Sequence, residues 1–464
     1  MKVLFIVIDT LRANHLSCYG YHRKTTPNID VFASKGVLFS NAYASDVPTQ
    51  PSYTSMFTGQ RGVKTGIVSH FFGTEEELRD STPYLSEILA KNGYATAAVS
   101  TLYIMRKWFT RGFQYYMNPM SWANPGRMQQ VDADEINAYA IPWIKENYKK
   151  DFFMFVQYWD PHTLYIPPKK YRYLWYKGDP TDPSNHSLDE AKKQEVWPFQ
   201  YKLIKAMRDA ENLPRDITDI EYIIAQYDGE ISYVDEKVGE LLHVLEDLDI
   251  ADDTLVILTA DHGENLGGNH AYFDHVNVYE PVIHVPLIVK YPNIIPRRKR
   301  IEALVQLIDI PYLILETLGI PIPDEFQGKS LLSLIDGKNS EIYSEVYSNQ
   351  GSWSCKRAII TKDGWKLIKT IDQGFWESPP IELFNLKKDS EENHNLVKEE
   401  EDIVNHLELQ MNRWLESNLG GRPDPLRLAS SRGLPPKTWV KNAAKMFTEE
   451  NQATYEEWRK NMGY

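Results

Sequence analysis

The chain contains several runs of apolar, β-branched residues that end at an acidic residue, and this pattern narrows the possible folds most. A continuous apolar run is typical of a strand that is buried on both faces of a parallel sheet. The three clearest runs and the acids that follow them are Val3–Ile8 with Asp9, Phe152–Trp159 with Asp160 and Thr254–Ala260 with Asp261. Because parallel sheets bind ligands beyond the carboxyl ends of their strands, we expect the three acids to converge there.

Helical segments separate these strands, which predicts an α/β fold with a mostly parallel sheet. Further strands are expected at Gly36–Tyr43, Tyr94–Ser100 and Val285–Lys290, and helices at Asn28–Lys35, Thr82–Asn92, Val131–Glu146, Ile220–Leu248 and Leu307–Leu318. The alternation of strand and helix signals weakens over residues 167–219, where we expect a surface excursion that partly covers a site. Residues 1–335 are therefore assigned to one large domain.

A smaller domain with a different pattern follows, from about residue 340 to residue 419. The turn signal Lys362-Asp363-Gly364 lies between two short strands and predicts a hairpin. Ile381–Leu386 predicts a further strand and Glu401–Leu419 an amphipathic helix, so we expect an α+β subdomain with an antiparallel sheet. The tail, residues 420–464, is rich in Pro and Lys and predicts a helix from about Glu449 to Met462.

Composition limits the kinds of partner. The 464-residue chain has a formal net charge of -13, which argues against nucleic-acid binding because phosphate backbones need a basic surface. Its two cysteines, Cys18 and Cys355, are too few for a disulfide framework and fit a reducing compartment. The first apolar run is too short for a signal peptide or a membrane span, so we expect a cytoplasmic protein. A homo-oligomer is compatible with the sequence.

The stretch from Val47 to Gly59, a loop that leads into a helix, presents a hydroxyl group in a place suited to an anion. Pro51 fits the first turn of a helix, which puts Thr49 just outside the helix start. Unpaired N–H groups and the positive end of the helix dipole attract an anionic ester to such a place. The Thr49 hydroxyl is therefore a candidate nucleophile, and a helix cap is its alternative role.

Histidines lie close to the acids at the strand ends, and together they form a candidate metal site. They are His162 after Asp160, His262 after Asp261, and His270 and His275 further along the chain. Zinc and manganese favour such oxygen and nitrogen ligands. A bound divalent cation lowers the pKa of a neighbouring hydroxyl, such as that of Thr49. A substrate contact explains His162 equally well, and a structural role is the better explanation of His270.

These motifs together resemble the sulfatase branch of the alkaline phosphatase superfamily, over about residues 1 to 419. The segments that carry the resemblance are Ile8–Arg12, Cys18–Tyr21, Thr26–Asp30, Pro51–Gly59, Asp160–His162, Thr259–Glu264, Tyr279–Glu280, Val285–Ile288 and Ile381–Leu386 with Asp389, Asn395 and Leu396. The resemblance implies a three-layer αβα sandwich with a mostly parallel central sheet, followed by a small α+β subdomain with an antiparallel sheet.

The chain departs from this family at the residues that handle sulfate. Thr49-Gln50-Pro51-Ser52-Tyr53 stands in place of the Cys-x-Pro-x-Arg motif, whose cysteine is converted to formylglycine. Threonine is not a substrate for that conversion, and Tyr53 replaces the arginine. The family's Gly-Lys-Trp-His segment falls on Ser100–Tyr103, and its downstream lysine falls on His275. The cationic groups that grip sulfate are thus largely absent.

What remains is similar to the threonine-nucleophile members of the superfamily, which are phosphodiesterases, phosphonate monoester hydrolases and phosphotransferases. The site residues that the resemblance implies are Asp9, Thr49, Asp261 and His262 for one metal, His162, His275 and Asp160 for a second metal or the substrate, and Thr101 and Tyr103 for the substrate. The implied cofactor is one or two divalent ions, zinc or manganese before calcium or magnesium.

We therefore expect a metal-dependent hydrolase of small anionic esters, either phosphodiesters or phosphonate monoesters, that works through a phospho-threonine intermediate. Three alternatives remain: a sulfatase that works without formylglycine, a phosphotransferase, and a catalytically inactive binding protein.

Overall fold

The computed structural model describes residues 1–70, 77–119, 131–194, 197–268, 271–291, 298–374 and 378–434. Its centre is an eight-stranded sheet. In spatial order the strands are β11 (Lys299–Gln306), β2 (Val37–Tyr43), β10 (His284–Lys290), β7 (Thr254–Thr259), β1 (Lys2–Ile8), β6 (Phe152–Tyr158), β4 (Ala95–Val99) and β5 (Tyr115–Met117).

Strand β1 lies in the middle of this sheet, and all seven of its residues are buried. It pairs in parallel with β7 on one side and β6 on the other, with Val3 opposite both Leu255 and Phe153. The carboxyl ends of the three strands therefore lie next to one another. Only β10 runs against its neighbours, antiparallel to β2 and β7, so the expected α/β fold with a mostly parallel sheet is confirmed.

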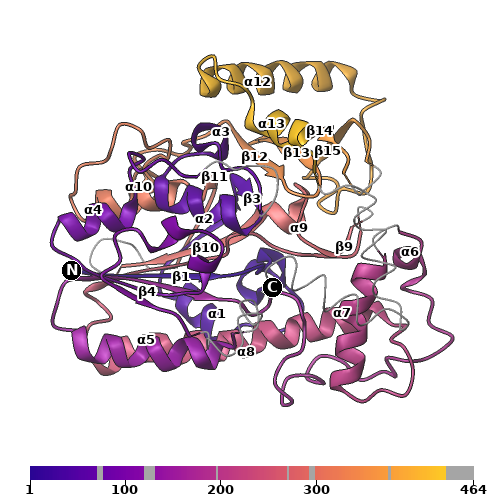
Figure 1. The fold of residues 1–464 in the computed structure, drawn as a ribbon, viewed down its shortest axis with the longest axis horizontal. Helices are drawn as coiled ribbons and strands as arrows, with labels where there is room; N and C mark the ends of the chain where they lie inside the picture. Colours follow the sequence, from indigo (N-terminus) through magenta and orange to yellow (C-terminus); the bar gives the residue numbers. More distant parts are fainter. Residues whose placement is uncertain are drawn as a thin grey trace.

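Helices cover both faces of the sheet, which makes the three layers seen in Figure 1. The layer drawn below the sheet consists of α1 (Pro27–Ser34), α5 (Ala133–Asn147) and α8 (Ile220–Asp247). The layer above it contains α2 (Thr49–Thr58), α4 (Leu85–Lys91) and α10 (Asp309–Thr317). The apolar faces of these helices and the buried strands form one continuous hydrophobic core.

The second sheet has five strands and extends the fold toward the C-terminus. Their order is β15 (Ile381–Asn385), β14 (Trp365–Asp372), β13 (Cys355–Thr361), β12 (Glu345–Gly351) and β3 (Asp46–Val47). The strands from β12 to β15 are antiparallel, as expected, and α12 (Glu401–Leu419) and α13 (Pro425–Arg432) pack beside them. Strand β3 pairs in parallel with β12, placing Val47 opposite Gln350. This sheet therefore reaches the segment directly before Thr49.

Several elements were not expected from the sequence. These are the strands β3, β5, β11 and β12, the short strand pair of β8 (Asn265–Leu266) and β9 (Tyr272–Asp274), and the helices α3 (Gly62–Thr65), α9 (Glu280–Ile283), α11 (Leu332–Ile335) and α13. The expected excursion contains two helices, α6 (Asp189–Lys192) and α7 (Trp197–Ala210). The tail helix predicted from Glu449 to Met462 lies outside the described residues. In the part of the chain that the structure describes, every helix is too short or too polar to cross a membrane.

Candidate active site

Thr49 is the first residue of α2, and it is fully buried. The first helical hydrogen bond runs from the N–H of Ser52 to the carbonyl of Pro48 at 3.1 Å, so Pro48 occupies the cap position. The expectation that Thr49 lies outside the helix is wrong, because the helix begins before Pro51. A proline is tolerated within the first turn, where N–H groups have no intrahelical partner. Thr49 is thus a first-turn residue and not the cap.

The hydroxyl of Thr49 contacts His262. Its Oγ1 lies 3.2 Å from Nε2 of His262, and Oδ2 of Asp261 lies 3.3 Å from the same nitrogen. Asp261 and His262 directly follow β7, whereas Thr49 belongs to α2. The hydroxyl of Ser52 donates to the carbonyl of Asp261 at 2.7 Å, which fastens the start of α2 to the end of β7. The fold therefore brings the candidate nucleophile to a strand end.

Asp9, which follows β1, adds a second buried carboxylate. Both of its oxygens are buried and have no hydrogen-bond partner among the described residues. Burial, and then the neighbouring Asp261 carboxylate, raises the pKa of Asp9 well above its usual value. Burial also raises the pKa of Asp261 to about 7. Two buried carboxylates side by side are costly to ionise unless a cation balances them.

The orientation of the His262 ring suits a metal ligand. Its Nδ1 lies 2.9 Å from the carbonyl of Gly263 and donates a hydrogen bond to it, which leaves the lone pair of Nε2 facing Thr49 and Asp261. Burial, and then the positive charge of His275, holds the pKa of His262 well below its usual value, so the ring is neutral. Metal-binding histidines are commonly held in this way by a carbonyl behind the ring.

Asp9, Asp261 and His262 together fit a divalent cation. One ligand atom from each lies within 4.8 Å of the other two, and all three side chains are buried. Two carboxylates and one neutral imidazole form a mixed oxygen and nitrogen ligand set that Zn²⁺ and Mn²⁺ favour. The predicted first-metal residues are therefore brought together, with the Thr49 hydroxyl beside them.

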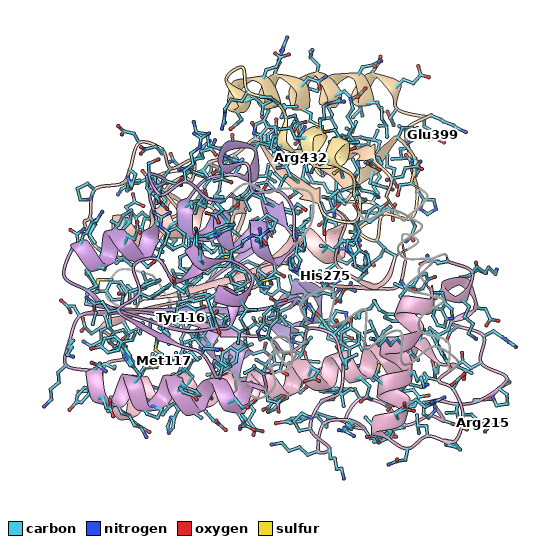
Figure 2. The ribbon with its side chains drawn as sticks, in the orientation of Figure 1. Tyr116, Met117, Arg215, His275, Glu399 and Arg432 are labelled. Carbon is cyan, nitrogen blue, oxygen red and sulfur yellow. The ribbon has the colours of Figure 1, made fainter. Side chains whose placement is uncertain are left out.

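His275 stacks on His262, with ring centroids 4.7 Å apart, and Figure 2 shows it near the middle of the molecule. Its Nδ1 lies 3.3 Å from Oε2 of Glu264, which is fully buried. Burial alone lowers the pKa of His275, but the neighbouring carboxylates, Glu264 first among them, raise it to about 9. In the metal-free protein these carboxylates therefore favour the protonated form of the ring, at the position where the family resemblance places a lysine.

His162 lies beside His275, with ring centroids 5.1 Å apart. Its Nδ1 is 2.9 Å from the carbonyl of Thr163, and its buried Nε2 has no partner among the described residues. Burial, and then the charge of His275, lowers the pKa of His162 to about 3, so this ring is neutral. Within the described ranges, Asp9, Asp261 and His262 form the only converging set of three ligands, and neither His162 nor His275 belongs to it.

Asp160 has a different environment from the other two strand-end acids. Its carboxylate accepts a hydrogen bond from the N–H of Ala133 at 2.9 Å, at the start of α5, and it lies beside the buried carboxyl of Glu230. The structure therefore does not place Asp160 in the converging set of ligands. Its side chain holds α5 to the end of β6.

Thr101 and Tyr103, the predicted substrate contacts, follow β4. The Oγ1 of Thr101 accepts a hydrogen bond from Nε1 of Trp159 at 2.7 Å, and Trp159 packs edge-on against His162 at a centroid distance of 5.5 Å. Tyr103 is half-buried, and its hydroxyl accepts a hydrogen bond from Asn118 at 3.3 Å. Thr101 is thus linked to His162 through one indole ring.

Glu264 and His70 are two site residues that the sequence did not single out for a role. Glu264 belongs to the same strand-end segment as Asp261, so its position contained a signal. His70 is buried, and burial followed by the positive charge of His275 holds its pKa well below its usual value. It lies in a loop without any pattern that marks a site. His270 lies outside the described residues.

Comparison with known proteins identifies two matching family models. The model described as Sulfatase matches residues 2–320, and the model described as N-sulphoglucosamine sulphohydrolase, C-terminal, matches residues 268–417. The second match spans β9 to β15 and most of α12, so it includes four of the five strands of the C-terminal sheet.

Curated relatives are sulfatases of bacteria and animals. An N-acetylglucosamine-6-O-sulfatase of Bacteroides thetaiotaomicron is 23% identical over 90% of this chain and 87% of its own length. An arylsulfatase of Clostridium perfringens is 24% identical over 94% of this chain and 98% of its own length.

Solved structures share the fold. A protein bound to its substrate D-glucosamine-2-N,6-O-disulfate has a TM-score of 0.73 at 20% identity, covering 91% of this chain and 99% of its own. A phosphonate monoester hydrolase from Silicibacter pomeroyi has a TM-score of 0.71 at 21% identity, covering 90% of this chain and 95% of its own. Since the Sulfatase model matches well over half of the chain, this protein belongs to the sulfatase family.

Proposed function

We propose that this protein is a metal-dependent hydrolase of phosphodiesters or phosphonate monoesters and that Thr49 is its nucleophile. The observation that carries the proposal is the 3.2 Å distance between Oγ1 of Thr49 and Nε2 of His262, next to two buried carboxylates. The hydroxyl is thus in reach of whatever cation the carboxylates and the imidazole hold. The first-turn position on α2 places Thr49 at the positive end of the helix dipole, which favours a negatively charged ester.

Asp9, Asp261 and His262 are the residues that hold the cation in this proposal. A bound divalent cation supplies a lower pKa for the Thr49 hydroxyl and offsets the negative charge of the ester. The neutral state of His262 supports this assignment, and so does the Asp9 carboxylate, which has no hydrogen-bond partner in the part of the chain that the structure describes.

The reaction has two displacements. In the first, Oγ1 of Thr49 forms a bond to phosphorus, the hydroxyl proton leaves, and the bond from phosphorus to the leaving oxygen breaks. The leaving oxygen takes up a proton and departs as an alcohol. In the second, a water oxygen attacks phosphorus, the bond from phosphorus to Thr49 breaks, and the threonine hydroxyl is restored. The net reaction consumes one ester and one water.

His162 and His275 contact the ester in this account and do not hold a second cation. The Nδ1 of His275 is engaged with Glu264, and the Nε2 of His162 is buried without a partner among the described residues. The imidazolium of His275 supplies positive charge to an ester oxygen, as a lysine does in the resemblance. Thr101 supports His162 through Trp159, and the half-buried Tyr103 is a candidate contact for the leaving group.

Phosphorus is favoured over sulfur because of the residue at position 49. Formylglycine is made from cysteine or serine, and both cysteines of this chain lie elsewhere, at Cys18 and Cys355. The arginine and lysine that accompany formylglycine are replaced by Tyr53 and His275. The fold similarity to phosphonate monoester hydrolases is compatible with this preference.

Hydrolysis of sulfate esters is the second candidate function, because the curated relatives are sulfatases. Paired assays separate the two. We expect a larger kcat/KM for bis(4-nitrophenyl) phosphate or 4-nitrophenyl phenylphosphonate than for 4-nitrophenyl sulfate, and loss of turnover in Thr49→Ala with all of them. A larger kcat/KM for the sulfate ester, lost in Thr49→Ala, overturns the choice of phosphorus but keeps the nucleophile.

A further inference from the structure

Thr10, the residue after Asp9, has an unusual backbone conformation. Its φ is +56°, in the left-handed region. That region is unfavourable for a β-branched residue because Cβ crowds the backbone, and such outliers persist only where the surroundings impose them. Asp9 itself is anchored, since its N–H donates to the carbonyl of Tyr158 at 2.9 Å. The strained turn therefore joins the end of β1 to the segment that follows it.

Two contacts hold both backbone polar groups of Thr10. Its N–H donates to Oδ1 of Asp261 at 3.3 Å. The backbone next to Asp9 is therefore hydrogen-bonded to Asp261, the other acid of the candidate cation site. Its carbonyl accepts a hydrogen bond from the hydroxyl of Tyr227 at 2.7 Å. The same hydroxyl accepts a hydrogen bond from the N–H of Arg12 at 3.0 Å. One phenol thus closes the turn from Thr10 to Arg12.

Tyr227 lies in α8 (Ile220–Asp247), and its surroundings fix the position of the phenol. Its side chain is fully buried and packs edge-on against His15 and Tyr165, with centroid distances of 5.2 and 5.6 Å. Burial raises the pKa of Tyr227 well above its usual value, so the hydroxyl keeps the proton that it donates. The Tyr227 side chain therefore connects α8, a helix of the lower layer, to the backbone that follows β1.

We propose that Tyr227 is a positioning residue that holds Thr10 in the left-handed conformation and thereby places Asp9 opposite Asp261 for cation binding. This inference rests on the proposed function, because it takes the cation site as given. Without the phenol hydroxyl, the Thr10 backbone relaxes toward negative φ, its N–H leaves Asp261, and the distance between the two carboxylates is no longer set. Side chains behind metal ligands commonly contribute about tenfold to 100-fold in metal affinity.

The test measures Mn²⁺ binding to the full chain by equilibrium dialysis, in wild type, Tyr227→Phe, Thr10→Gly and the double variant. Tyr227→Phe removes only the hydroxyl, and we expect its Mn²⁺ affinity to fall about tenfold or more. Glycine adopts positive φ without strain, so in the Thr10→Gly background the same Tyr227→Phe change is expected to cost less than about threefold. The hydroxyl and the strained residue are then coupled, as the proposal requires.

Tyr19→Phe is a matched control. The hydroxyl of Tyr19 accepts a hydrogen bond from the N–H of Leu287 at 2.8 Å and donates to the carbonyl of Phe39 at 2.9 Å, which copies the arrangement at Tyr227 away from the site. Thermal unfolding in EDTA checks that each variant is folded. We expect Tyr19→Phe to bind Mn²⁺ as wild type does.

Three results overturn the proposal while leaving the cation site in place. Tyr227→Phe binds Mn²⁺ as tightly as wild type, or the Tyr227→Phe change lowers Mn²⁺ affinity by the same factor with Thr10 and with Gly at position 10. In the third, Tyr19→Phe lowers Mn²⁺ affinity as much as Tyr227→Phe does. Wild-type protein that takes up no Mn²⁺ overturns the cation site and this inference together. Activity of the loaded enzyme is not needed for any of these outcomes.

Discussion

Oγ1 of Thr49 and Nε2 of His262 lie 3.2 Å apart, although the two residues are 213 positions apart in the sequence, Thr49 in α2 and His262 after β7. The histidine nitrogen carries a lone pair because the other ring nitrogen donates to Gly263. In the proposed function, this contact places the Thr49 hydroxyl within reach of the cation that His262 would bind. The candidate nucleophile, the candidate ligand set and the start of α2 therefore lie together.

The first prediction concerns the number of cations. We expect one divalent ion per chain, because one converging set of three ligands is found in the described residues. Asp9→Asn is expected to lose bound metal and to lower kcat/KM by about 100-fold or more, since a carboxylate ligand is removed. Metal analysis by mass spectrometry and steady-state kinetics check this. Two tightly bound ions per active chain contradict the account, because His162 and His275 are then ligands.

The second prediction concerns pH and uses Asp261. Burial raises the pKa of this carboxyl from 3.8 to about 7, so the folded metal-free protein holds a proton there that the unfolded chain releases. The contribution of Asp261 to the free energy of unfolding is therefore present below about pH 4 and is lost as the pH rises toward 7. Asp261→Asn removes this titration while keeping an oxygen for the N–H groups of Thr10 and His262.

In EDTA, the stability of Asp261→Asn relative to wild type is thus expected to increase between pH 5 and pH 7.5, by about 1 kcal/mol or more. Urea unfolding at the two pH values measures it. Titrating groups that do not interact with Asp261 cancel in the difference, whereas the neighbouring Asp9 and His275 contribute to it. Added Mn²⁺ is expected to reverse the order by stabilising only the wild type. A stability difference that does not change with pH contradicts the assignment.

The third prediction concerns Glu264, whose Oε2 lies 3.3 Å from Nδ1 of His275. Glu264→Gln keeps the shape but removes the charge that orients the imidazolium. We expect kcat/KM to fall about tenfold to 100-fold, the value of a charged hydrogen bond, with metal content unchanged. Glu236→Gln, which alters an exposed pair with Lys170, is the control and should leave kcat/KM unchanged. Equal activity of Glu264→Gln and wild type removes His275 from the site.

The fourth prediction concerns the joint between the two sheets. Lys366 of β14 is completely buried between Glu280, the first residue of α9, and Glu392, at 3.0 and 2.7 Å. Lys366→Ala leaves the buried carboxylate of Glu392 and the partly buried carboxylate of Glu280 without a cation, which is expected to cost about 3–5 kcal/mol of stability. Lys362→Ala removes a half-exposed pair with Glu341 and is expected to cost less than about 0.5 kcal/mol. Urea unfolding compares them, and similar losses contradict the proposed role of the buried ion pair.

Sequence patterns predicted the central sheet well because its strands are continuous apolar runs. The strand β1 is buried on both faces and leaves a clear signal, and so do β6 and β7. The missed strand β11, Lys299–Gln306, contains three charged residues in its first half and only a three-residue apolar run, Ala303-Leu304-Val305, so it lacks a long apolar run. Strand β3 has two residues, and its place in the C-terminal sheet is set by pairing with β12, which no local pattern reveals.

The candidate site was predicted in part for the same reason. Asp9, Asp261 and His262 directly follow buried strands, so the topology of the sheet implies their convergence. Asp160 has the same sequence context, but its carboxylate accepts a hydrogen bond from the N–H of Ala133 at the start of α5. Tyr227 lies within the long helix α8, where a buried tyrosine looks like any other core residue. Its role depends on the φ of Thr10, which a sequence does not display.

Capture of a covalent intermediate decides whether Thr49 is the nucleophile. The enzyme is mixed with 4-nitrophenyl phenylphosphonate, quenched with acid before one turnover is complete, digested and examined by mass spectrometry. We expect a phenylphosphonyl group on Thr49 and no such adduct in Thr49→Ala. In Thr49→Ser we expect slower turnover with the adduct on the serine at position 49. An adduct on another residue, or undiminished turnover by Thr49→Ala, contradicts it.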